Sequence, residues 1–143
     1  MSSTFTLSAF IVCDDIRSEA TGKDMLIGVY ADAIILPRFP ARLPKLCFRV
    51  TVTDITVEKP KAFTFYVHDT EGKARLQFEQ VLPDNFPTAH STFTFVANSP
   101  AFDKPTELVA SFGIDCVPTP IGRIAIREAA TDDERARIQL THG

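Results

Sequence analysis

The most chemically loaded part of the sequence is the stretch CDDIRSEATGKD, between Cys13 and Asp24. One thiol, four carboxylates and two cations lie there. A thiol can act as a nucleophile when a base activates it, and carboxylate oxygens from neighbouring loops can bind calcium. A third interpretation is structural, because Gly22 takes a positive φ more readily than other residues and suits the tip of a β-hairpin.

The hairpin is the interpretation that we favour for this stretch. Charges of both signs then become neighbours on two solvated strands, where an ion pair contributes about 0–1 kcal/mol. Such pairs shape a turn without giving it an activity. The residues predicted to build this structural hairpin are Asp14, Asp15, Arg17, Gly22 and Lys23.

The rest of the sequence offers no convincing catalytic group. Cys13 has no base within its own stretch, and His68 and His90 fall on other predicted strands. His68 and Asp69 are adjacent, and adjacent residues of a strand point to opposite faces, so they make a poor catalytic pair. We therefore predict that the protein is not an enzyme and uses no cofactor.

The alternative function is a calcium-dependent or lipid-surface binding module. In an antiparallel chain the odd-numbered connections share one end of the sheets, and the acidic side chains in them are Asp14, Asp15, Asp24, Glu58 and Asp84. Oxygen ligands from several loops would suit calcium. The same connections contain the cations Arg17, Lys23, Lys59 and Lys61, which offset the acids. The favoured prediction accordingly contains no metal ligands.

Strands must position these side chains, because apolar and polar residues alternate along most of the chain. Leu46, Phe48 and Val50, for example, alternate with Cys47 and Arg49. The breaks between such runs are rich in Gly, Pro, Asp and Asn, which are turn residues. The pattern predicts about eight strands, at residues 5–14, 24–36, 46–53, 63–68, 74–81, 90–97, 108–116 and 121–127.

Strands at this spacing predict an all-β fold, a two-sheet antiparallel β-sandwich, with a closed barrel as the alternative that periodicity does not separate. A chain of 143 residues suits one domain, which we place at residues 1–130. Residues 131–143 form a tail or a short C-terminal helix, since Thr131 and Glu134 match a capping box. A frayed tail is the other possibility, because a short helix alone is marginal in water.

Charge and hydropathy exclude several classes of protein. A net charge of −3 gives no basic footprint for nucleic acid. The sequence has no apolar run near the roughly 20 residues that span a membrane, and no secretory signal, so we expect a cytoplasmic protein. Cys13, Cys47 and Cys116 are far apart and include no C-x-x-C pair, which favours reduced thiols over a disulfide.

A proline-rich connection at residues 37–45 is the main candidate for a binding patch. Proline restricts its own φ and pushes the preceding residue toward an extended conformation, so the segment is stiff. Its exposed side chains could form an interaction patch of Arg38, Phe39 and Arg42. The alternative, which we favour, is that Phe39 plugs the open end of the sandwich. Phe86 and Phe102 also stand between prolines, as plugs or as exposed anchors.

The N-terminal part of the sequence resembles a known family. The segments AFIVCDDIR, GKDMLIGVY and ILPRFP are similar to the N-terminal pattern of short uncharacterised bacterial and phage proteins that share a domain of unknown function. The matching positions are Cys13, Asp14, Arg17, Gly22, Lys23, Ile27 and Gly28, and the similarity covers roughly the first 45 residues. The resemblance implies a small β-sandwich of immunoglobulin-like character. It implies no activity.

Together these observations predict a non-enzymatic protein–protein interaction or structural module. Stiff loops with aromatic residues and open sheet edges are surfaces that other chains can bind. We expect the partner to be another protein or a second copy of the chain.

Overall fold

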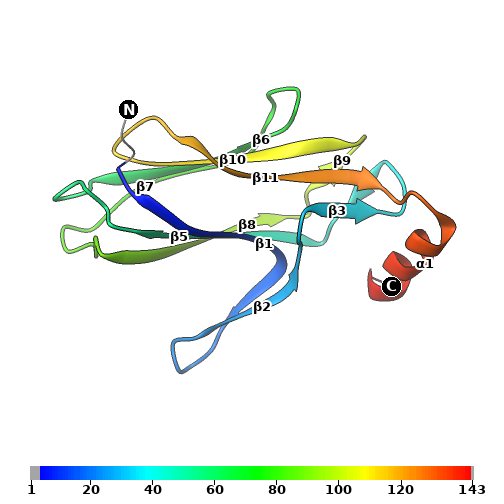
Figure 1. Cartoon of the computed structure of the whole chain (residues 1–143), viewed down its shortest axis with the longest axis horizontal. Coiled ribbons are helices and arrows are strands. Elements are labelled where there is room, and N and C mark those ends of the chain that lie inside the picture. Colours follow the sequence, from blue (N-terminus) through cyan, green and yellow to red (C-terminus); the bar gives the residue numbers. More distant parts are fainter. Residues whose placement is uncertain (1–3, 143) are drawn as a thin grey trace.

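The computed structural model describes residues 4–142, so Gly143 of the predicted tail and residues 1–3 of the predicted domain lie outside the described residues. Eleven strands and one helix follow one another along the chain (Figure 1). Their bounds are β1 Thr6–Ser18, β2 Asp24–Val29, β3 Ala33–Leu36, β4 Ala41–Arg42, β5 Lys45–Thr53, β6 Ala62–His68, β7 Ala74–Val81, β8 His90–Asn98, β9 Ala101–Phe102, β10 Thr106–Ile114, β11 Thr119–Glu128 and α1 Asp132–His142.

The strands form two facing sheets, which confirms the predicted β-sandwich. Sheet A has the order β2-β1-β5-β8, and sheet B has the order β3-β11-β10-β6-β7. The strands pair antiparallel except β3 and β11, which pair parallel, and the short strands β4 and β9 pair with each other. Both sheets keep open edges, so the structure is a sandwich and not a closed barrel.

Phenylalanines fill the space between the sheets. In β6 every second side chain is buried, as alternation requires when one face of a sheet covers the other sheet. Phe65 of sheet B stacks on Phe95 of sheet A, with ring centroids 4.0 Å apart and planes 2° apart. Phe48 and Phe112 are also buried in this core. Aromatic pairs of this kind stabilise the core beyond the effect of area alone.

The predicted strand at residues 24–36 is interrupted in the structure. Tyr30 donates its backbone N–H to Val12 in sheet A, whereas the Asp32 carbonyl accepts from Ala125 in sheet B. The chain therefore crosses between the sheets at Ala31, and one apolar run becomes the two strands β2 and β3. This crossing and the short strands β4 and β9 raise the number of strands above the eight predicted.

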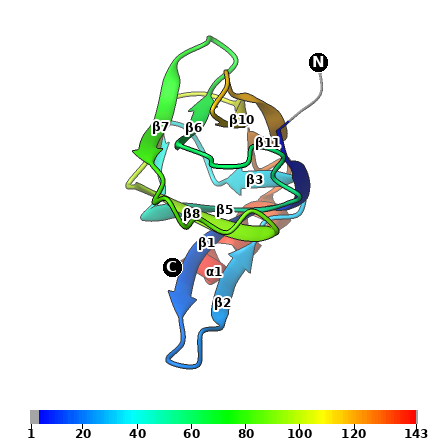
Figure 2. The ribbon, with the colours of Figure 1, turned by 90° about the vertical axis from the view of Figure 1, so that its left-hand side faces the viewer.

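Strand β1 is longer than its neighbour β5 and continues beyond the sandwich. Its first part, Thr6 to Cys13, pairs with β5, and its last part, Cys13 to Ser18, pairs with β2. We call residues 14–29 the arm. Figure 2 shows the arm extending away from the rest of the sandwich, below β5 and β8 and on the side away from sheet B. Asp14, Asp15 and Arg17 therefore lie within a strand, while Gly22 and Lys23 lie in the turn.

Helix α1 confirms the predicted C-terminal helix. Thr131 accepts the Glu134 N–H at 3.1 Å, and the Glu134 carboxylate accepts the Ala130 N–H at 2.7 Å. Glu134 also binds Arg127 of β11, and this hydrogen bond lowers the pKa of Glu134 to about 2. Among residues 4–142, no helix has the length and apolar character needed to cross a membrane.

Candidate interaction surfaces

An apolar groove runs along one side of the sandwich. Strand β8 is the last strand of sheet A and β7 is the last strand of sheet B, and both lie on the same side of the molecule (Figure 2). The groove between them has a volume of about 480 Å³. Its lining residues are Phe63, Phe78, Gln80, Val81, Leu82, Pro83, Phe86, Thr92, Phe93, Thr94 and Phe95. We call this the edge groove.

Phenylalanine rings from both sheets build the floor of the edge groove. Phe63 lies 4.7 Å from Phe93 between ring centroids, and Phe78 lies 5.3 Å from Phe95. Phe86, in the connection from β7 to β8, packs on Phe93 at 5.7 Å. These contacts hold the rings in place before any ligand binds. The groove is therefore a preformed apolar surface.

The edge groove is open because nothing in the described chain covers the outer end of β7. Most of β7 is exposed, including the groove residues Phe78 and Val81, and Val81 is 79% exposed. Strand β7 pairs only with β6, and β8 pairs only with β5. Each strand therefore leaves one row of backbone N–H and C=O groups without a partner strand, which is the feature that lets sheets add another strand.

The segment of the chain that supplies most of the edge groove carries a negative charge. Between Leu76 and Asn98 the chain contains Glu79 and Asp84 but no lysine or arginine. Both acidic residues are exposed. A binding segment with a cation beside its apolar residues would complement this surface.

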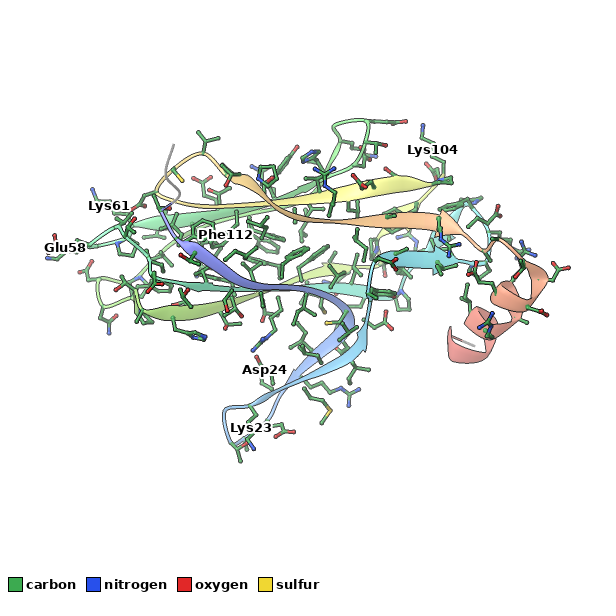
Figure 3. The ribbon with its side chains drawn as sticks, in the orientation of Figure 1. Lys23, Asp24, Glu58, Lys61, Lys104 and Phe112 are labelled. Carbon is green, nitrogen blue, oxygen red and sulfur yellow. The ribbon has the colours of Figure 1, made fainter. Side chains whose placement is uncertain are left out.

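The arm is the second unusual surface. Its turn is closed by hydrogen bonds from Glu19 N to Lys23 O at 2.7 Å and from Gly22 N to Glu19 O at 3.0 Å, with Gly22 at φ 85°. Asp24 points back toward the sandwich, and Lys23 lies at the tip (Figure 3). The Asp24 carboxylate lies 3.5 Å from the Arg49 guanidinium of β5. This ion pair connects the arm to the outer face of sheet A.

One face of the arm is apolar and exposed. Met25, Ile27 and Val29 alternate along β2, and Val29 is 56% exposed. Side chains at alternate positions share one face of a strand. The register places Arg17 directly opposite Met25, so a cation stands beside this apolar stripe.

The base of the arm is buried and polar. Cys13 and Cys47 are directly opposite each other on β1 and β5, and both are free thiols. Burial, and then the neighbouring Cys47, raises the pKa of Cys13 to about 11. Burial also raises the pKa of Cys47. Both side chains are therefore protonated at neutral pH, which makes them poor nucleophiles.

Two carboxylates at the base of the arm have specific partners. Asp14 accepts a short hydrogen bond from Tyr30, whose pKa is raised by burial and then by this bond. Asp15 binds Lys45 at 2.8 Å and Arg17 at 3.1 Å, and these bonds lower the pKa of Asp15. Gly28, at φ 68°, leaves the space that the Asp14 carboxylate occupies. These contacts stabilise the base of the arm.

The predicted patch at the proline-rich connection has a mixed character. Arg38 and Arg42 are exposed, and Arg42 donates a hydrogen bond to the Ser99 carbonyl at 2.6 Å. Phe39 is half-buried and packs against the core. Of the other two candidate plugs, Phe102 is buried and Phe86 is half-buried in the edge groove.

The structure does not bring the candidate catalytic and metal-binding residues together. His68 stacks on Tyr66, and Asp69 instead accepts hydrogen bonds from Glu71, Lys73 and Arg75. Asp14 and Asp24 lie on the arm, at the edge of sheet A opposite to the connection that contains Asp84. Within residues 4–142 no group of three His, Cys, Asp or Glu side chains could hold a metal ion.

Comparison with known proteins places this chain in a family. The model of DUF6941, a family of unknown function, matches residues 8–127, so the chain belongs to this family. The match includes β5 to β10 as well as the arm, and therefore extends well beyond the N-terminal pattern. No curated protein matches the chain.

Proposed function

We propose that this member of the family is a non-enzymatic protein-binding module that takes an extended apolar segment of a partner into the edge groove. One observation carries the proposal: five phenylalanines line an open groove of about 480 Å³ between two edge strands. Large exposed apolar surfaces on folded proteins commonly mark binding sites.

The edge strands explain how a partner segment would be held. A strand added to an open sheet edge gains backbone hydrogen bonds, and its alternate side chains enter pockets on one face. Strand β8 offers the open edge, and the rings of Phe78, Phe86, Phe93 and Phe95 offer the pocket. The guest segment would therefore alternate large apolar residues with polar ones.

The topology supports an immunoglobulin-like relationship within this proposal. Two packed, mostly antiparallel sheets, with the chain crossing between them, are typical of such sandwiches, and many members act in recognition. The free thiols of Cys13 and Cys47, directly opposite each other, support a reducing, cytoplasmic location.

A peptide selection tests this function. Random peptides displayed on phage would be selected on the wild-type protein, and the selected peptides would be measured on Val81→Asp, which places a charge at the rim of the groove. We expect peptides with alternating apolar residues and about tenfold weaker binding to the variant. Val117→Asp, at a site that is 81% exposed outside the groove, is the matched control.

The patch of Arg38, Phe39 and Arg42 is the competing surface for the same function. Two exposed arginines beside an aromatic ring have the composition of an interface hot spot. Replacing Phe39 and Arg42 by alanine should leave the selected peptides bound if the edge groove is the site. If the double variant loses peptide binding and Val81→Asp keeps it, the peptides bind at the patch and not in the edge groove.

A further inference from the structure

The arm and the edge groove lie at opposite edges of the same sheet. The order β2-β1-β5-β8 puts the arm at one side of sheet A and the groove at the other. Two strands therefore separate β2 from β8 within one molecule, and the arm points away from the groove (Figure 2). An arm can meet a groove only on a different copy of the chain.

The shapes and chemistry of the two surfaces match. The arm presents an apolar stripe of Met25, Ile27 and Val29 on β2, an edge strand that pairs with β1 on one side only. The edge groove presents phenylalanine rings beside β7 and β8, each of which has one side without a partner strand. Strand β2 has six residues, a length of about 20 Å, and the eight and nine residues of β7 and β8 are long enough to accept it.

The charges match as well. Asp15 and Asp24 of the arm are bound by Lys45 and Arg49 of its own β5. Arg17 also pairs with Asp15 at 3.1 Å, so that one carboxylate is shared by two cations and a net positive charge remains beside the apolar stripe, where the Arg17 side chain is 70% exposed. The groove segment has Glu79 and Asp84 and no cation to oppose it. Opposite charges at the rim steer and orient an interface of this kind.

We propose that the occupant of the edge groove is the arm of a second copy of this chain. The inference rests on the proposed function, because it names the partner of the same groove. The contact uses two different surfaces, so it is heterologous, and repetition would give a ring or an open filament. Strand β2 of one copy then continues sheet A of the next copy beyond β8.

Complementation between two variants tests the inference. Ile27→Asp damages the arm and leaves the groove, whereas Val81→Asp damages the groove and leaves the arm. Sedimentation velocity should show wild-type association that increases with concentration, and about tenfold weaker association or more for each variant alone. A mixture of the two variants should form a one-to-one complex, since one intact arm and one intact groove remain. Val117→Asp should associate like the wild type.

A charge reversal gives a second measurement on folded protein. Arg17→Glu should weaken association, and combining it with Glu79→Lys and Asp84→Lys should restore association. Thermal melting of each variant checks that the sandwich is intact, because all the changed side chains are exposed.

Several results would overturn the inference. A wild-type chain that stays monomeric at every concentration would do so, as would a mixture of Ile27→Asp and Val81→Asp that forms no complex. Loss of association in Ile27→Asp alone would indicate pairing of arm with arm instead. If selected peptides still bind the groove in any of these cases, the inference fails and the proposed function stands. If no peptide binds the groove, the proposed function fails independently.

Discussion

Strand β1 runs through two regions that have the same strand pairing but differ in how deeply their side chains are buried. Between Thr6 and Cys13 it pairs with β5, and Val12 faces the second sheet and is buried. Between Asp14 and Ser18 it pairs with β2, and the arm has mostly half-buried or exposed side chains. Both regions have paired backbones and alternating side chains. Apart from Cys13 and Cys47 at the base of the arm, the difference shows that burial in these two regions comes from the opposing sheet and not from strand pairing.

The comparison implies two kinds of stability. Residues between the sheets should determine the free energy of unfolding of the whole sandwich. Residues of the arm should affect only local opening, because little apolar surface is buried there.

The largest effect is expected at Phe65. Its side chain is fully buried and stacks on Phe95 and packs on Phe48. Phe65→Ala should lower the free energy of unfolding by about 3–5 kcal/mol, because it removes apolar burial and leaves a cavity. Chemical denaturation followed by circular dichroism measures the loss. A loss below about 1 kcal/mol would contradict the role given to the phenylalanine core.

The cysteines report where the buried region ends. A pKa of about 11 for Cys13, in place of the ordinary 9.0, leaves about a hundredfold less thiolate at neutral pH. Native protein treated with a thiol reagent should therefore react at the exposed Cys116 and far more slowly at Cys13 and Cys47. The rate at Cys13 should rise with pH toward that pKa. Rapid labelling of all three thiols in native protein would mean that the base of the arm is open.

A smaller, local effect is expected at Gly28. A Cβ at this position would clash with the Asp14 carboxylate, and the φ of 68° is unfavourable for other residues. Gly28→Ala should destabilise the arm by about 1–3 kcal/mol, visible as faster hydrogen exchange in β2 with little change in the core. Gly22→Ala is the matched control, because that glycine also has a positive φ but no atom within 4 Å. Equal destabilisation by Gly28→Ala and Gly22→Ala would show that the positive φ, and not the contact with Asp14, causes the loss.

The smallest effect is expected on the apolar face of the arm. Ile27→Ala should change the free energy of unfolding by less than about 0.5 kcal/mol, because the side chain is exposed and fills no core position. The denaturation midpoint, compared with that of Phe65→Ala, gives the measurement. A loss similar to that of Phe65→Ala would mean that the arm is part of the core.

Much of the fold could be predicted from the sequence, because alternation reports burial directly. Phe48, Phe65, Phe95 and Phe112 fall on apolar faces in the sequence and are buried in the structure. The capping box of α1 was also visible, since it depends only on Thr131 and Glu134. Alternation does not show which strand a residue faces, however. The run from Asp24 to Leu36 therefore concealed the crossing between sheets at Ala31.

The candidate site could not be predicted for the same reason. The connection from β7 to β8, residues 82–89, is short and contains turn residues, but its two strands lie in different sheets. Phe78 and Phe86 therefore line a groove between sheets, and no local pattern indicates this. The exposed stripe of the arm was hidden similarly, since Met25, Ile27 and Val29 look like core positions until the absence of an opposing sheet is known.

The parallel pair of β3 and β11 has a consequence for synthesis of the protein. Ala33 is translated about 90 residues before its partner Ala125. Sheet A can begin to form once β1 and β5 have emerged, whereas β3 has no partner strand until β11 has been translated. Emergence of β11 from the exit tunnel is then the event that completes sheet B and gives β3 its partner strand.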